Sequence, residues 1–182
     1  MRLATRAGRA GGFSMIEVLV TLVITAIGLL GLAKMQAAAL GNTHVARVRS
    51  LIALQTQSLA ALMQVNRAYW AATTVPARVV MRGGAVTESG GGNPLNAPAN
   101  CRDNPCRPDQ LAAADLQAWA AGMQARFPGY DAVLSCVNMA APPVSCSVTV
   151  SWSEKYVAIH RNTALGAQAQ TSVQRFTLHI QP

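Results

Sequence analysis

The sequence predicts an α+β fold in which one long N-terminal α-helix packs on a small antiparallel β-sheet. Three observations predict it: an apolar run begins at Phe13, its pattern becomes amphipathic from about Ala46, and segments with strand periodicity occupy the last part of the chain. Apolar residues three or four apart indicate a helix, whereas alternation indicates a strand. The 182 residues fit one domain plus a segment.

The apolar run is long enough to cross a membrane. From Phe13 to Ala33 it holds 21 residues and one charge, Glu17. At about 1.5 Å per residue, this is roughly 31 Å of helix, close to the thickness of a bilayer core. An ionisable group in such a helix costs about 2.5–3.5 kcal/mol of free energy on insertion scales. We therefore expect Glu17 to have a function and a partner of opposite charge.

We expect the helix to run from about Ser14 to about Ala68, because no proline occurs between Phe13 and Val75. Its first half would lie in a membrane, and its second half would pack an apolar stripe on a globular domain. The residues expected in that stripe are Val48, Leu51, Ile52, Gln55, Leu59, Leu62, Met63 and Asn66.

A second, shorter helix is predicted after a connecting region. The connection holds one candidate strand at Val79–Met81, followed by a turn at Gly83-Gly84. Asp109 is a plausible N-cap for the short helix, which we expect to continue to about Arg126. Pro128-Gly129 would end it.

Three strand candidates follow the short helix: Ala132–Val137, Val144–Trp152 and Ser172–Ile180. A turn from Asn138 through Pro143 would join the first two. Three further residues would either extend the second strand or form a short piece of their own: Tyr156, Val157 and Ile159. We expect the strands to form an antiparallel meander on the amphipathic half of the long helix.

The start of the chain resembles a type IV prepilin. In that family a short positive leader ends in Gly, the next residue is usually Phe, and a Glu stands four residues further on. Gly12, Phe13 and Glu17 match those places, and Arg2, Arg6 and Arg9 make the preceding stretch basic. Gly12 has no side chain, so a protease can approach its backbone closely.

The resemblance implies a processing route and a fold. A prepilin peptidase would cut after Gly12, and the new terminus at Phe13 would be N-methylated. Residues 1–12 are then a cleaved leader, residues 13–40 the transmembrane or filament-core half of the helix, and residues 41–182 a periplasmic or extracellular domain with a type IV pilin-like fold. Cleavage creates an α-amine at Phe13, and Glu17 of a neighbouring helix could neutralise it and set the axial register of subunits.

The cysteine count is even, with all four beyond residue 100. Disulfides persist outside the cytoplasm, where the resemblance places this domain. Three pairings are possible, and we favour the local ones, Cys101–Cys106 and Cys136–Cys146. Four thiols could hold zinc, but neither pair has C-x2-C spacing and no His lies close to them, so we expect no metal site.

The sequence offers little chemistry for catalysis. It contains no Gly-x-Ser-x-Gly, His-Glu-x-x-His or phosphate-loop motif. We therefore expect no enzymatic activity and no cofactor, and we expect His44, His160 and His179 to be structural or solvated. The net charge falls from +8 to +5 without the three leader arginines, and we interpret this balance as favouring solubility rather than nucleic-acid binding, because aromatics are only 5% of the chain.

A second resemblance narrows the family. Gly28–Ala33, Ala114–Trp119 and Phe127–Gly129 resemble the type IV pilus modification protein (PilV) family of minor pilins. It implies a structural subunit that takes part in starting pilus assembly at the tip, in the inner membrane before assembly and on the cell surface afterwards. Its partners would be the prepilin peptidase, the other minor pilins, the major pilin and a candidate tip adhesin. The alternatives are a DNA-binding minor pilin for DNA uptake and a minor pseudopilin of a type II secretion system.

Overall fold

The computed structural model describes residues 12–72, 74–89, 94–97, 99–137, 143–155 and 171–182. The expected leader, apart from Gly12, falls outside these residues, as do His160 and the strand extension expected at Tyr156, Val157 and Ile159. The chain divides into two compact units, Met1–Asn42 and Thr43–Pro182.

Helix α1 (Met15–Val65) is the long N-terminal helix that the sequence predicts, and it is unbroken over its 51 residues. Within the first unit nearly all of its side chains are exposed. It is the one helix in the described part of the chain that is long and apolar enough to cross a membrane. Residues in this half have no core of their own to pack against, so lipid or other helices must cover them.

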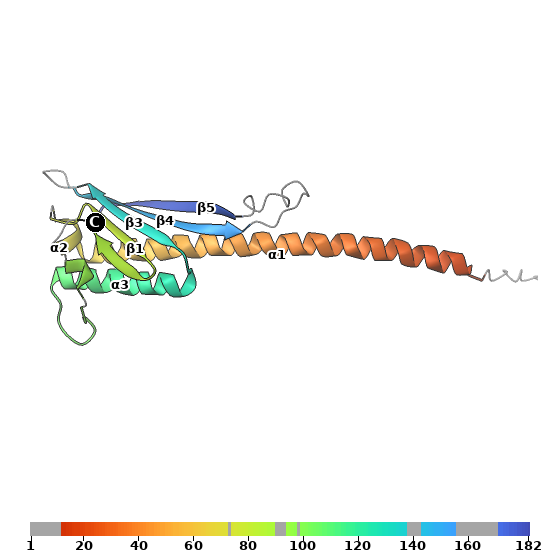
Figure 1. Ribbon diagram of the computed structural model, residues 1–182, viewed down its shortest axis with the longest axis horizontal. Helices are drawn as coiled ribbons and strands as arrows, with labels where there is room; N and C mark the ends of the chain where they lie inside the picture. The colour runs from red at the N-terminus through yellow and green to blue at the C-terminus, as the bar shows by residue number, and fades with distance from the viewer. Residues whose placement is uncertain (1–11, 73, 90–93, 98, 138–142, 156–170) are drawn as a thin grey trace, which may run out of the picture. The chain divides into compact units, whose positions relative to one another are not determined.

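The second unit contains an antiparallel sheet with five described strands in the order β2-β1-β3-β4-β5 (Figure 1). The strands are β1 (Arg78–Arg82), β2 (Ala85–Glu88), β3 (Asp131–Val137), β4 (Ser145–Lys155) and β5 (Thr171–Ile180). The shorter helical elements are α2 (Arg67–Trp70), η1 (Pro94–Asn96) and α3 (Pro108–Arg126). The meander of β3, β4 and β5 and the antiparallel pairing are as the sequence predicts.

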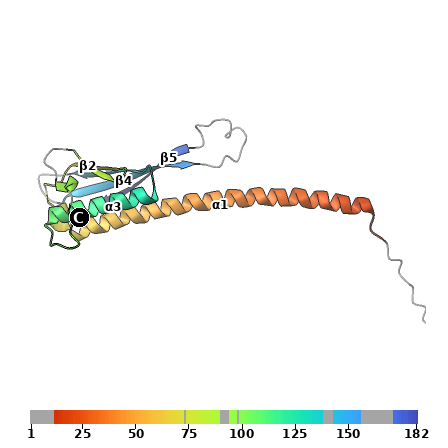
Figure 2. The same ribbon diagram turned by 60° about the horizontal axis from the view of Figure 1, so that its bottom comes forward.

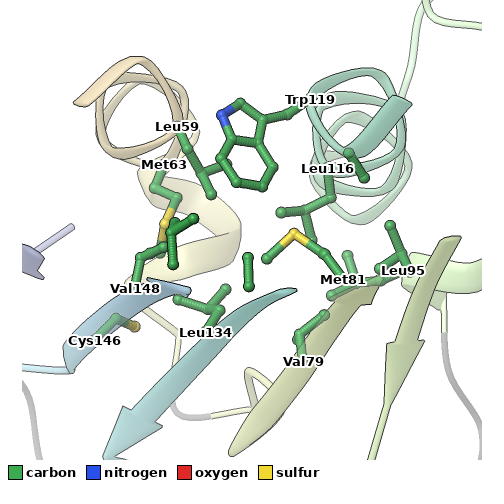
Figure 3. Close-up of a cluster of buried hydrophobic side chains, with 14 of the residues drawn as sticks. Leu59, Met63, Val79, Met81, Leu95, Leu116, Trp119, Leu134, Cys146 and Val148 are labelled. Atoms are coloured by element: carbon green, nitrogen blue, oxygen red, sulfur yellow. The ribbon is translucent and has the colours of Figure 1, made fainter. Parts of the chain in front are cut away.

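Helix α3 lies beside the part of α1 that belongs to the second unit, and the sheet lies against both helices (Figures 1 and 2). The Trp119 indole Nε1 donates a hydrogen bond to the Gln55 carbonyl oxygen at 2.8 Å, which fastens α3 to α1. Figure 3 shows side chains from the helices, η1 and the strands meeting in one apolar cluster that includes Leu59, Met63, Val79, Met81, Leu95, Leu116, Leu134 and Val148. Burying each such side chain stabilises the fold by about 1.5–3 kcal/mol.

The buried stripe of α1 differs from the predicted stripe in five residues, and two of them, Val48 and Gln55, are only partly buried. Ile52, Leu59, Met63 and Asn66 are buried as expected. Leu51 and Leu62 lie at the rim of the stripe and remain 38% and 36% exposed. Thr56 is fully buried instead, and its hydroxyl donates to the Ile52 carbonyl at 2.8 Å. This local bond satisfies the hydroxyl and lets a polar residue occupy a core position.

The predicted N-cap at Asp109 is wrong by two residues. Helix α3 begins at Pro108, with Arg107 as its N-cap, so Asp109 lies in the first turn. The Gln110 side-chain oxygen accepts a hydrogen bond from the Arg107 backbone N–H at 3.0 Å. Proline at the first helical position is favourable because its missing N–H would have no intrahelical partner there.

Strand β2 was not predicted, although the turn before it was. Gly83 and Gly84 join β1 to β2 with φ of 59° and 80°. Two consecutive residues with positive φ are typical of the tight turn that joins antiparallel strands, and glycine adopts that backbone without steric cost.

Candidate processing and assembly site

The Gly12–Phe13 peptide bond lies immediately before the start of α1. Residues 12–14 have no regular secondary structure, and the Ser14 carbonyl accepts the first helical hydrogen bonds, from the N–H groups of Glu17 at 3.0 Å and Val18 at 3.3 Å. The Phe13 side chain is 85% exposed. A Cβ added at Gly12 would meet no described atom within 4 Å. The bond is therefore accessible, and any requirement for Gly at position 12 comes from an enzyme rather than from this fold.

Glu17 lies in the first turn of α1 and is exposed. Among the described residues its side chain has no hydrogen bond or ion pair. The N-terminal end of a helix carries a partial positive charge, which favours a carboxylate at this place. The carboxylate is thus available to a cation that another molecule supplies.

The two threonines of the apolar stretch bond to the helix backbone. Thr21 Oγ1 donates to the Val18 carbonyl at 2.8 Å. Thr25 Oγ1 lies 2.9 Å from the carbonyls of Thr21 and Leu22. Hydroxyls satisfied in this way enter an apolar environment at low cost. Glu17 differs from them because its charge has no such internal partner.

Large apolar side chains around the helix in the first unit are uncovered. Ile16, Leu29 and Met35 are 69%, 67% and 73% exposed, and with 3.6 residues per turn they lie on three different sides of α1. A surface that is apolar all round suits a membrane or the centre of a helical assembly. The first unit therefore combines an accessible Gly–Phe bond, an unpaired carboxylate and a surface that requires an apolar partner.

The four cysteines form the two local disulfides expected from the sequence. Cys101 pairs with Cys106 in the loop before α3, and Cys136 pairs with Cys146. Cys136 and Cys146 are directly opposite each other on β3 and β4, and both are buried. The bridges stabilise the loop and one end of the sheet. Among the described residues no group of three or more His, Cys, Asp or Glu side chains could hold a metal ion.

Sequence reasoning missed an ion pair at the other end of β4. Arg49 of α1 contacts Glu154 through both carboxylate oxygens, and the Trp152 indole Nε1 donates to Glu154 Oε1 at 2.9 Å. The Arg49 hydrogen bond holds the pKa of Glu154 below its usual range, although burial opposes that shift. No local sequence pattern predicts the contact between Arg49 and Glu154, because the two residues are far apart in sequence.

A hollow of about 270 Å³ adjoins this ion pair. It is lined by His44, Val45, Val48, Ser153 and Glu154. The Glu154 carboxylate already accepts bonds from Arg49 and Trp152, so it is not poised for acid or base chemistry. His44 and His179, two of the three histidines considered above, are exposed on the described surface.

Residues 8–33 match the family model of the prokaryotic N-terminal methylation motif. No curated protein and no solved structure matches the chain. The matched residues include the Gly12–Phe13 bond, Glu17 and the apolar stretch to Ala33. Together with the long N-terminal helix and the antiparallel sheet, the motif supports a type IV pilin or pseudopilin with the α+β fold typical of that class.

Proposed function

We propose that this protein is a minor type IV pilin, similar to the PilV family, that helps to start or cap the pilus and has no enzymatic activity. The observation that carries the proposal is the exposed Gly12–Phe13 bond, followed within one helical turn by the unpaired carboxylate of Glu17. The motif implies processing by the prepilin peptidase and assembly with other pilins.

The assembly mechanism follows from the two charges that processing brings together. Hydrolysis of the Gly12–Phe13 bond gives Phe13 a free α-amine, which remains a cation when it is N-methylated. In an assembly the amine of one subunit would face Glu17 of its neighbour. The attraction between the two charges would then offset much of the free energy that each of them costs in an apolar core. The apolar residues of the first unit would leave lipid for contact with similar helices at little change in solvation.

The PilV-like role is supported by residues of the second unit. Helix α3 contains the Ala114–Trp119 segment and ends at Arg126, and Gly129 then adopts φ of 86° before β3 begins. This order of short helix, Pro-Gly and strands is the one that the resemblance implies. Trp119 packs in the core and bonds to α1, so its role in this arrangement is structural.

Localisation follows from the same features. One long apolar helix near the N-terminus fits anchoring in the inner membrane before assembly and incorporation into the pilus afterwards. The partners that we propose are the other minor pilins, the major pilin and a tip adhesin.

A minor pseudopilin of a type II secretion system is the second candidate, because its N-terminus has the same motif. Deletion of the gene separates the two. The pilin role predicts loss of surface pili and twitching with normal protein secretion, whereas the reverse phenotype would support the secretion role. Retention of the domain by the other minor pilins in a pull-down would place it in the tip assembly.

DNA binding is the weaker alternative. Three described arginines, Arg49, Arg82 and Arg107, form ion pairs with carboxylates, which reduces the positive charge available to phosphates. DNA retention by the protein that falls steeply with added salt would favour this alternative over a purely structural role.

A further inference from the structure

The two edges of the sheet differ in how they are protected. Strand β2, at one edge, has four residues, and η1 contacts it. The Leu95 backbone N–H donates to Glu88 Oε1 at 3.0 Å and fixes η1 there. Strand β5, at the other edge, has ten residues, and within the described part of the chain it pairs only with β4.

Residues 175–180 of β5, which we call the β5 edge, have the features of an open pairing site. Their pairing with β4 continues without a bulge from Arg175 opposite Ser151 to Ile180 opposite Cys146. The segment contains no proline. On its other side, the described residues supply no backbone partner. Proteins usually shorten, bend or cover such an edge, because its free N–H and C=O groups accept another strand.

Side chains of the β5 edge form two distinct rows. Phe176 and Leu178 point to the core side, pack against the core and are only partly buried. Arg175, Thr177 and His179 are exposed on the opposite face of the sheet. A strand added at this edge would cover the two apolar side chains on one face and would lie beside Arg175 and His179 on the other.

We propose that the β5 edge binds an extended segment of a partner protein, which adds to the sheet as a further strand. The segment would carry apolar side chains on the core side and acidic side chains on the outer face. Main-chain hydrogen bonds would provide affinity, and the alternating side chains would provide specificity. The inference rests on the sheet alone and holds whether or not the proposed pilus role is right.

A second copy of this chain fits the edge poorly. Antiparallel pairing of two β5 edges must keep core-side residues opposite core-side residues. When the two strands are centred on residue 175, Arg175 of one copy lies opposite Arg175 of the other. When they are centred on 176, the two Arg175 side chains are diagonal neighbours. When they are centred on 177, Arg175 lies opposite His179 of the other copy. Basic side chains so close across two strands are destabilising when both are charged. An acidic partner strand avoids this repulsion and replaces it with attraction.

Amide hydrogen exchange of the full chain in detergent micelles tests the proposal. The probe is a soluble seven-residue peptide that alternates valine with glutamate. Two control peptides replace glutamate with lysine or N-methylate every central amide. We expect the glutamate peptide at saturation to slow exchange within residues 175–180 at least tenfold. The lysine peptide should bind at least tenfold more weakly, and the N-methylated peptide should have no effect.

Three variants distinguish strand addition at the β5 edge from nonspecific binding of the peptide. Leu178→Lys places a charge on the core-side row and should abolish binding of the glutamate peptide, whereas Thr177→Lys adds the same charge to the outer row and should preserve or tighten it. If Leu178→Lys does not fold, Arg175→Glu serves instead and should reverse the preference toward the lysine peptide.

Several outcomes would overturn the inference. Equal binding of the glutamate and N-methylated peptides would show that main-chain pairing is not involved. No change in exchange within residues 175–180 would show that the edge does not accept a strand. Protection of the same residues that grows with chain concentration, without peptide, would identify a second copy as the occupant.

Discussion

Arg49 on α1 and Glu154 on β4 form a bidentate ion pair, although 105 positions separate them in sequence. The Nε–Oε1 distance is 2.9 Å and the Nη2–Oε2 distance is 2.7 Å. The Glu154 side chain is 3% exposed, whereas that of Arg49 is 48% exposed. Because Cys146 lies near the other end of β4, the strand is fixed at both ends, by a disulfide to β3 and by an ion pair to α1.

Loss of Arg49 should destabilise the second unit, because it leaves a buried carboxylate without its main partner. We expect Arg49→Ala to lower the free energy of unfolding by about 1–3 kcal/mol, below the effect of breaking a fully buried pair because Arg49 is half exposed. Arg82→Ala is the matched control, since its pair with Asp131 is exposed and should contribute about 0–1 kcal/mol. Denaturant titration of both variants measures the difference, and equal effects would contradict the prediction.

The same pair should make stability depend on acid pH. The pKa of Glu154 is lower in the folded state than its usual 4.5, so its contribution is present in full above about pH 4.5 and is lost as the pH falls through the folded pKa. Unfolding midpoints measured from pH 7 to pH 3 should fall less steeply in Arg49→Ala than in the natural chain. Parallel curves for the two proteins would show that Glu154 is not the titrating group.

The disulfides should leave no free thiol in the exported protein. Cys136→Ser with Cys146→Ser removes a buried bridge between neighbouring strands, and we expect a loss of about 2–4 kcal/mol. The pair Cys101→Ser and Cys106→Ser should lose less, because its bridge lies in a more exposed loop. Thiol titration of the unreduced protein, together with thermal unfolding of both double variants, checks these expectations. Four reactive thiols in the native protein would refute them.

Much of the fold could be predicted because its signals are local. The absence of proline before Val75 indicates α1, and the alternating residues of β3, β4 and β5 indicate strands. Strand β2 was missed because it is only four residues long and has one buried apolar side chain, Val86. The N-cap was misplaced because α3 begins at Pro108, so that Arg107 is the N-cap and Asp109 already lies inside the first turn.

Tertiary contacts could not be predicted in the same way. The packing of the sheet and α3 together sets which face of α1 is buried, so Thr56 enters the core while Leu51 stays at its rim. The Arg49–Glu154 pair depends on where β4 ends relative to α1, and neither residue has a distinctive sequence context. By contrast, the candidate processing site could be proposed from the sequence because Gly12, Phe13 and Glu17 are contiguous with the apolar run.

Blocking the cleavage site should leave the leader attached. Gly12→Val introduces a side chain that this fold accommodates, since no described atom lies near the added Cβ. We therefore expect normal folding but failed processing, with the protein retained in the inner membrane. Mass spectrometry of the variant should show residues before Phe13, and a normal methylated terminus at Phe13 would argue against the assigned cleavage bond.

The central claim is that the Glu17 carboxylate pairs with the α-amine of Phe13 on a neighbouring subunit. Glu17→Leu should still be inserted and cleaved after Gly12, because the substitution makes the helix more apolar and leaves the bond unchanged. It should enter pili poorly, because the α-amine of its neighbour would have no carboxylate partner in the apolar core. Thr21→Val is the matched control, since it removes a polar group that bonds only to the Val18 carbonyl of its own helix.

The most direct measurement is an immunoblot of sheared pili and membranes from cells that carry each variant. Mature Glu17→Leu protein should accumulate in the membrane fraction and be depleted from pili, whereas Thr21→Val should distribute as the natural protein does. Unprocessed Glu17→Leu protein would instead assign Glu17 to recognition by the peptidase. Mature Glu17→Leu protein present in pili at the normal ratio would contradict the pairing.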